Sequence, residues 1–390
     1  MAPSSLRESQ KASRFTESVI REMTRVAREH GAINLAQGFP DFPAPDALKE
    51  AAVRWIREDV NQYAVTWGSD RLRAAIGTYM QNRRGVTIDP DAQVTVCCGA
   101  TEAMIAAMMG VLDPGDEFLV PEPFYENYGP DGILADAVPL FVPMGDGFTL
   151  DIDAMRKASG PKTRAVVLNT PHNPTGRVFN REELRALCEF VIERDLLLFT
   201  DEIYEEILFT GDHYCPLLEP GMAERTIVIS GASKTFSVTG WRVGWIISPP
   251  ALTGGIRKVH DFLTVGAPAP LQEAVAEALL WEDEYFSTMR EEYRQRREVM
   301  VAGLRDAGFP CDIPEGAYYA MVDISAFQKS DEDDVAFAMR LVREAGVATV
   351  PGSSFYHDPA DGKHLVRFCY AKKIETLEAA NARLKKWATA

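Results

Sequence analysis

Short β-branched runs alternate with longer stretches of helical spacing along most of the chain. In the stretch 16–30, Val19, Met23 and Val26 recur at spacings of four and three residues, which predicts an amphipathic helix. After a segment rich in Gly and Pro at 33–42, the pattern predicts helices at 46–58, 70–83, 101–111, 126–134, 151–157 and 181–194. It predicts strands at 93–97, 117–120, 138–142, 164–169, 196–200, 226–230 and 243–247.

This alternation predicts an α/β protein with a mostly parallel central sheet in a large domain and a smaller α+β domain. Runs such as RAVVLN and TIVIS are apolar almost throughout, which is typical of strands covered on both faces. A long charged helix is expected at roughly 284–306, and after it the order changes to strand, helix and strand. The expected parts are an N-terminal arm with part of the small domain at 1–45, the large cofactor-binding domain at 46–284 and the C-terminal small domain at 285–390.

Composition and charge narrow the function classes. The 390 residues leave room for about two domains. With 41 basic against 57 acidic residues, the net charge of −16 opposes a phosphate backbone, so we expect no nucleic-acid partner. No apolar run approaches the ~18 residues that a membrane-spanning helix needs, so we expect no membrane partner. Six cysteines without CxxC spacing favour reduced thiols and a cytoplasmic location, and they argue against a metal site.

Candidate chemistry gathers where predicted strands end, which is where open α/β sheets bind ligands. The strand at 93–97 leads through Gly99, Ala100 and Thr101 into a helix, whose first N–H groups suit a phosphate. That pattern alone also occurs as an ordinary turn. Three further strand ends carry polar side chains, namely Asn173 before a proline, Asp201 with Tyr204, and Ser233 with Lys234 followed by Arg242.

Taken together, these strand ends supply an amine, a carboxylate, a phenol, an amide and a Ser/Arg pair. Each has an ordinary explanation by itself, and Asp201 for example could cap a helix. As a set they match the needs of pyridoxal 5′-phosphate. Its aldehyde requires a lysine, its pyridine nitrogen a carboxylate, and its phosphate an arginine, hydroxyls and helix N–H groups.

The chain resembles, over nearly its whole length, the class I/II aminotransferases among the fold type I pyridoxal phosphate enzymes. The stretches QGFPDFPAP, NQYAVTWG, EPFYENYGP and SKTFSVTGWRVGW are similar to kynurenine, methionine and aromatic aminotransferases. The resemblance implies that Lys234 forms a Schiff base with the cofactor and moves the substrate proton. It also implies that Asp201 pairs with the pyridine nitrogen, while Tyr204 and Asn173 bind the 3′ oxygen.

The same resemblance implies the remaining contacts. The phosphate is expected to be held by Gly99, Ala100, Thr101, Ser233 and Arg242, with Tyr63 contributed by the neighbouring subunit of a homodimer. Tyr125 is expected to stack on the pyridine ring. The substrate α-carboxylate is expected to bind Arg367, helped by Asn173 and the backbone of Gly38.

The expected reaction is a ping-pong transfer of an amino group from an L-amino acid to a 2-oxo acid. Phe39, Phe124 and Tyr125 near the expected pocket favour aromatic or bulky neutral donors, and no second arginine is evident that would select a dicarboxylic side chain. A β- or γ-lyase, a replacement enzyme or an oxidase on the same scaffold is an alternative, because each begins with proton loss to the same lysine. A regulatory protein with a degenerate aminotransferase domain is disfavoured, since Lys234 and Arg367 are both present.

Overall fold

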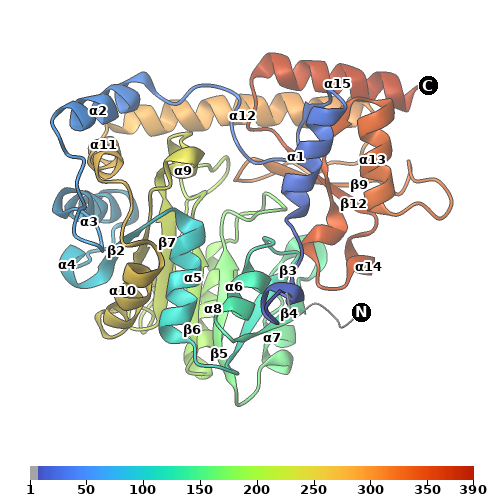
Figure 1. The fold of residues 1–390 in the computed structure, drawn as a ribbon. Helices are drawn as coiled ribbons and strands as arrows, with labels where there is room; N and C mark the ends of the chain where they lie inside the picture. The colour runs from blue at the N-terminus through green and yellow to red at the C-terminus, as the bar shows by residue number, and fades with distance from the viewer. Residues whose placement is uncertain (1–7) are drawn as a thin grey trace, which may run out of the picture.

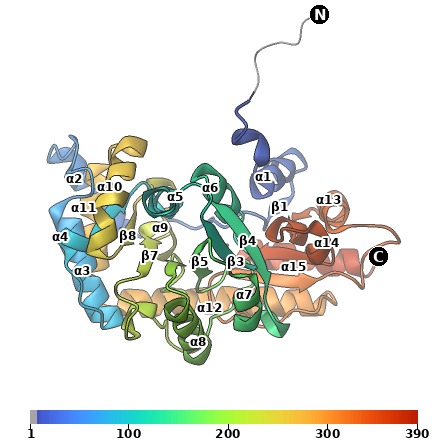
Figure 2. The ribbon, with the colours of Figure 1, turned by 90° about the horizontal axis from the view of Figure 1, so that it is seen from below.

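The computed structural model describes residues 8–390, and its centre is a twisted seven-stranded sheet (Figures 1 and 2). In spatial order the strands are β2 (Val94–Cys97), β8 (Gly244–Ile247), β7 (Thr226–Gly231), β6 (Leu197–Asp201), β5 (Thr163–Asn169), β3 (Glu117–Glu122) and β4 (Val138–Pro143). From β7 to β4 all neighbours are parallel, and β8 runs antiparallel to both β7 and β2. The predicted mostly parallel α/β sheet is confirmed.

Helices cover both faces of this sheet (Figure 2). The alternation along β5 shows this directly, because Val167 packs in the cluster around α5 whereas Val166 and Leu168 pack in the cluster around α8. The surrounding helices are α2 (Asp46–Arg57), α3 (Asp70–Arg84), α4 (Pro90–Gln93), α5 (Ala100–Val111), α6 (Tyr128–Leu134), α7 (Ile152–Ala158), α8 (Arg181–Glu193), α10 (Pro250–Thr264) and α11 (Ala269–Leu279). The strands are therefore buried on both sides, as their apolar runs predict.

A second, smaller set of elements lies beside the large sheet (Figure 1). Its antiparallel sheet consists of β11 (Val350–Pro351), β12 (Leu365–Cys369) and β9 (Tyr319–Asp323). The early strand β1 (Ile33–Asn34) pairs in parallel with β10 (Val347–Ala348), so the N-terminal segment joins the C-terminal elements. The helices here are α1 (Val19–Glu29), α13 (Asp334–Glu344), α14 (Pro359–Gly362) and α15 (Ile374–Ala388), and the long α12 (Asp283–Asp306) runs along both parts.

Most helix and strand limits agree with the sequence pattern to within one or two residues. The pattern gave no indication of α10 or α11. In α11 most side chains are buried, including Gln272 and Glu273, so the helix lacks the polar face that makes periodicity visible. Within residues 8–390, no helix is long and apolar enough to cross a lipid bilayer.

Candidate active site

A cavity of about 460 Å³ opens at the carboxyl ends of β5, β6 and β7, and β12 and α1 border it from the other side. Most of the residues expected from the sequence line it together. They are Gly38, Ala100, Thr101, Tyr125, Asn173, Asp201, Tyr204, Ser233, Lys234, Arg242 and Arg367. Gly99 directly precedes the lining residue Ala100 and caps helix α5.

Lys234 lies in the short helix α9 (Ala232–Thr235), which follows β7 without a loop. Gly231 makes this turn possible, because a Cβ at that position would lie 2.9 Å from the Cα of Gly244. The Nζ of Lys234 donates to the Gly38 carbonyl at 3.3 Å. Burial lowers the pKa of Lys234 to about 8, and Arg242 contributes in the same direction. A substantial fraction of an amine with this pKa is neutral near pH 7.5, as a proton acceptor requires.

Asp201 ends strand β6 and is buried against the wall of the cavity. Its Oδ2 accepts a hydrogen bond from the Tyr128 hydroxyl at 2.8 Å, and its Oδ1 accepts one from the Ile203 backbone at 3.3 Å. Burial nevertheless raises the pKa of Asp201 to about 6. A cationic ring nitrogen beside this carboxyl would favour its ionised form.

The turn before α5 forms a cradle suited to an anion. Gly99 has φ of +85°, and a Cβ there would lie 2.3 Å from the Nη2 of Arg242, so glycine is needed for the guanidinium to approach the turn. The first N–H groups of α5 and the positive end of its dipole lie at the same place. Ser233 and Thr101 line the cavity beside them. This donor set fits a phosphate.

Arg367 projects from β12 and is fully buried. Its Nη1 donates to Asn173 Oδ1 at 2.6 Å and its Nη2 donates to the Ala36 carbonyl at 2.9 Å. Its Nε is buried without a hydrogen-bond partner. A buried guanidinium with an unused donor beside the cavity fits a carboxylate ligand.

Two tyrosines meet near the lysine, whose Nζ lies 5.6 Å from the centre of the Tyr204 ring. The hydroxyls of Tyr204 and Tyr319 lie 2.9 Å apart, and burial raises the pKa of Tyr204 well above its ordinary value. Tyr204 therefore stays protonated at neutral pH and can donate a hydrogen bond to an oxygen in the cavity.

The structure does not bring Tyr63 to the cavity of its own chain. Its side chain is 88% exposed, and it does not line the site. Conversely, sequence reasoning missed several lining residues, namely Ser18, Ile20, Arg21, Gln37, Glu126, Tyr128, Asp131 and Tyr319. Arg21 belongs to the polar side of an amphipathic helix, so nothing in the sequence distinguishes it from a solvated arginine.

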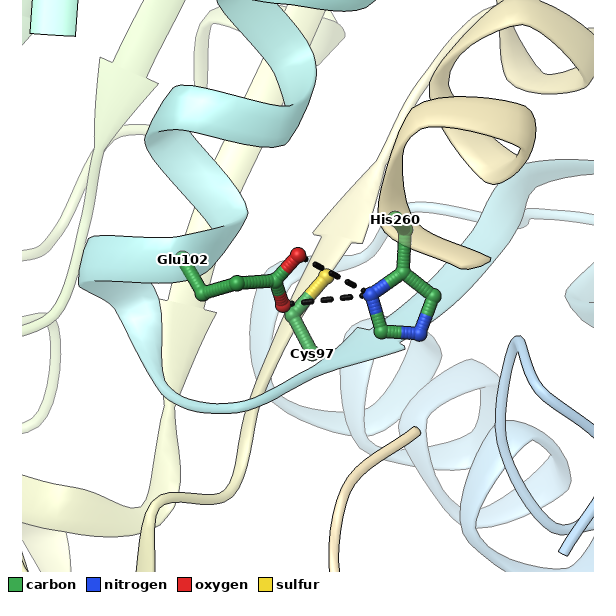
Figure 3. A group of neighbouring side chains, drawn as sticks. All are labelled: Cys97, Glu102 and His260. Atoms are coloured by element: carbon green, nitrogen blue, oxygen red, sulfur yellow. Dashed lines mark hydrogen bonds and ion pairs between the residues drawn. The ribbon is translucent and has the colours of Figure 1, made fainter. Parts of the chain in front are cut away.

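Two groups of potential metal ligands lie elsewhere in the part of the chain that the structure describes. One consists of Cys97, Glu102 and His260, drawn in Figure 3, and the other of Glu202, Glu205 and His213. None of these side chains lines the cavity.

Sheet topology and site together define a class of protein. A lysine directly after a strand, a buried carboxyl at the next strand end and an anion cradle share one cavity, as in fold type I pyridoxal 5′-phosphate enzymes. Residues 30–384 match the family model described as aminotransferase class I and II. The chain belongs to this family, and it is a pyridoxal phosphate-dependent aminotransferase.

Relatives agree with this placement. A probable N-succinyldiaminopimelate aminotransferase of Mycobacterium tuberculosis is 42% identical over 95% of this chain and 96% of its own length. The methionine aminotransferase of Escherichia coli is 37% identical over 94% of this chain and 95% of its own length. Among solved structures, the N-succinyldiaminopimelate aminotransferase of M. tuberculosis matches with a TM-score of 0.93 and 40% identity, covering 98% of this chain and all of that one.

These findings confirm the family, the fold type, the cofactor and the enzyme class expected from the sequence. Because the relatives are named as aminotransferases, they support amino-group transfer and not the lyase alternative.

Proposed function

We propose that this enzyme transfers the amino group of an aromatic or bulky neutral L-amino acid to a 2-oxo acid, with Lys234 as the proton-transferring base. One observation supports these roles above all. The Nζ of Lys234 and the guanidinium of Arg367 face the same cavity, from the large sheet and from β12 respectively. A substrate whose carboxylate binds Arg367 would therefore have its Cα in the same cavity as the lysine amine.

When bound, pyridoxal phosphate supplies an aldehyde that condenses with amines and a ring that takes up the electrons of the broken Cα–H bond. The residues of this chain transfer the proton and hold the cofactor. The neutral Nζ of Lys234 accepts the proton from Cα and later returns it to the neighbouring carbon. With the cofactor bound, the Asp201 carboxylate would hold a proton at the ring nitrogen, and Tyr204 and Asn173 would donate to the ring oxygen.

The phosphate would be held by the Gly99–Thr101 turn together with Ser233 and Arg242. Because the helix N–H groups and the guanidinium point to one place, they bind the dianion and fix the ring relative to Lys234. The Tyr125 ring lines the cavity and would cover one face of the cofactor.

Apolar side chains at the cavity support a bulky donor. Ile20, Phe39 and Tyr125 line it from three different segments of the chain. The relatives are named for different substrates, N-succinyldiaminopimelate in one case and methionine in another, so family membership alone does not select the donor.

A homodimer would explain why Tyr63 is exposed and lies outside the cavity of its own chain. Several large apolar side chains are exposed in two segments that adjoin at Thr66 and Gly266, and these are Tyr63, Val65, Phe262, Leu263 and Val265. A second copy of the chain would cover them and receive Tyr63 at its phosphate. We further propose that residues 8–45 and 285–390, the part that carries Arg367, close over the substrate against residues 46–284. We also propose that the enzyme works in the cytoplasm with its six cysteines reduced.

A single-turnover experiment tests the function. The cofactor-loaded enzyme is mixed with individual amino acids in the absence of any 2-oxo acid, and the cofactor spectrum and released ammonia are followed. We expect stoichiometric spectral conversion with aromatic and bulky neutral donors, reversed by 2-oxoglutarate or pyruvate, and no ammonia. Continued ammonia release without an acceptor would contradict transamination as the main activity.

A further inference from the structure

His260 of helix α10 is fully buried beside the Gly99–Thr101 turn, which we call the phosphate turn (Figure 3). Its Nδ1 lies 3.0 and 3.1 Å from the two carboxylate oxygens of Glu102, and its Nε2 lies 2.8 Å from the carbonyl oxygen of Thr66. A carbonyl and an ionised carboxylate only accept hydrogen bonds. The ring donates to both partners when each nitrogen carries a proton, as in an imidazolium that bridges Glu102 and Thr66.

The Glu102 end of this bridge fixes the phosphate turn. Glu102 directly follows Thr101 in the first turn of α5, and its Oε2 accepts a hydrogen bond from the Cys98 backbone at 2.9 Å. The Glu102 side chain therefore links the first turn of α5 to Cys98, across Gly99–Thr101. This hydrogen bond restrains the turn whose N–H groups face the cavity.

The Thr66 end fixes the segment that carries Tyr63. Next to Thr66, the Trp67 carbonyl accepts from the Val96 backbone at 3.0 Å, which attaches the segment to β2. Gly266 lies against Thr66 as well, since a Cβ there would be 3.3 Å from the Thr66 oxygen. Tyr63 lies three residues before this anchored point.

We propose that His260 is a positioning residue for the cofactor phosphate, because its two N–H groups hold the Gly99–Thr101 turn and the Tyr63 segment in a fixed relation. This proposal rests on the proposed role of that turn in phosphate binding. It does not depend on Lys234 or on which substrate is used.

The surroundings favour the protonated ring. Burial by itself would lower the pKa of His260, but the hydrogen bond and charge of Glu102 and the Thr66 carbonyl outweigh it, so the pKa is raised. Asp261 adds a second negative charge. Burial raises the pKa of the Cys97 and Cys98 thiols, which therefore stay neutral, and the Thr264 hydroxyl lies 3.4 Å from Nδ1. Because the pKa is raised, the bridge is lost only as pH rises through that higher pKa.

A metal ion is the competing explanation for the same three side chains, since Cys97, Glu102 and His260 each offer a ligand atom within 4.8 Å of the others. A metal would need a thiolate and an unprotonated Nδ1. The Cys97 thiol instead donates to the Thr95 carbonyl at 3.6 Å, and its raised pKa opposes the thiolate.

The experiment compares two probes on the full-length protein stripped of cofactor. Pyridoxamine 5′-phosphate carries the phosphate and pyridoxamine does not, and neither needs to react with Lys234. We expect His260→Gln and Glu102→Gln each to weaken binding of pyridoxamine phosphate about tenfold at pH 7 while leaving pyridoxamine binding unchanged. The ratio of wild-type to His260→Gln affinity should fall towards one at high pH.

His213→Gln is the matched control, because it removes another buried histidine–glutamate pair, with 2.6 Å between His213 and Glu202, away from the turn. It should leave the affinity for both probes unchanged. If His260→Gln does not fold, Glu102→Gln carries the same comparison. Equal weakening of both probes, or equal effects of His213→Gln and His260→Gln, would overturn the proposal in favour of a merely structural pair. A stoichiometric metal that disappears in Cys97→Ser would overturn it in favour of a metal site.

Discussion

The carbonyl oxygen of Gly38 accepts hydrogen bonds from both the Nζ of Lys234, at 3.3 Å, and the hydroxyl of Tyr318, at 2.8 Å. The lysine amine thus points from the end of β7 towards the N-terminal segment that borders the cavity. Lys372 also stabilises this segment, because its Nζ donates a hydrogen bond to the Phe39 carbonyl at 2.7 Å. The position of the base therefore depends on residues from three distant parts of the chain.

Replacing this lysine is the first test of the assigned chemistry. Lys234→Ala should lower turnover by about 1,000-fold or more, because the variant lacks the amine that we assign to move the Cα proton. It should also abolish the absorbance of the covalently held cofactor. Binding of pyridoxamine 5′-phosphate should persist, since the phosphate cradle is intact. A variant that kept both turnover and the cofactor band would contradict the assignment.

The raised pKa of Asp201 predicts how the stability of the apoprotein depends on pH. Its folded-state pKa of about 6 lies above the ordinary value of 3.8, so the apoprotein should lose stability between about pH 4 and 6 as this buried carboxyl ionises. Asp201→Asn removes that loss. We expect the apo variant to be more stable than the wild-type apoprotein by about 3 kcal/mol at pH 7 and equally stable at pH 4, as measured by urea unfolding.

In the cofactor-loaded enzyme, by contrast, we expect Asp201→Asn to be unfavourable. A ring nitrogen that shares a proton with Asp201 needs the ionised carboxylate, so the loaded Asp201→Asn enzyme should deprotonate Cα far more slowly while still binding the phosphate. If the apo variant were less stable than the wild type at pH 7, the buried carboxyl would not carry the desolvation cost argued above.

Arg367 should act on substrates that carry an α-carboxylate. Since its guanidinium is buried and held by Asn173 and Ala36, Arg367→Lys should lower kcat/KM for amino acids about 100-fold through loss of the paired donors. Amines without a carboxylate should react at nearly unchanged rates. Kinetics with an amino acid and its decarboxylated analogue provide the measurement, and equal losses for both would show that the arginine acts on the protein structure instead.

The strand-end residues could be predicted from sequence because each follows a short apolar run whose limits are clear. Asn173 and Lys234 follow β5 and β7, Asp201 ends β6, and parallel strands bring such ends to one edge of the sheet. Arg367 lies on a strand with no comparable signal, and it was identified through the family resemblance alone.

The missed residues depend on packing between distant segments. Arg21 reaches the cavity only because α1 packs against β10 and β11, contacts that no local pattern encodes. His260 was missed for a related reason, since the hydrophobic pattern does not predict helix α10 and its partners Glu102 and Thr66 lie about 160 and 190 residues away. Long-range pairs of this kind become visible only once the fold is known.

Arg21 leads to a prediction about the acceptor. It lines the cavity, and its guanidinium forms no ion pair or hydrogen bond within residues 8–390, whereas Arg242 and Arg367 are assigned to the phosphate and the α-carboxylate. Arg21→Gln should therefore raise KM for a dicarboxylic acceptor such as 2-oxoglutarate by about tenfold and leave KM for pyruvate nearly unchanged. Steady-state kinetics with the two acceptors and one common donor decide this. A similar change for both would place Arg21 outside the acceptor site.

Tyr63 supplies the sharpest test of the proposed dimer, because each complete site would combine Lys234 of one subunit with Tyr63 of the other. Tyr63→Ala should weaken cofactor binding about tenfold, so its homodimers should be poorly active at limiting cofactor, and Lys234→Ala homodimers should be inactive. When the two variants are unfolded and refolded together, a mixed dimer would contain one site with both residues intact. Activity at limiting cofactor should then exceed the sum of the separate variants, whereas a Tyr63 that served its own chain would give no such gain.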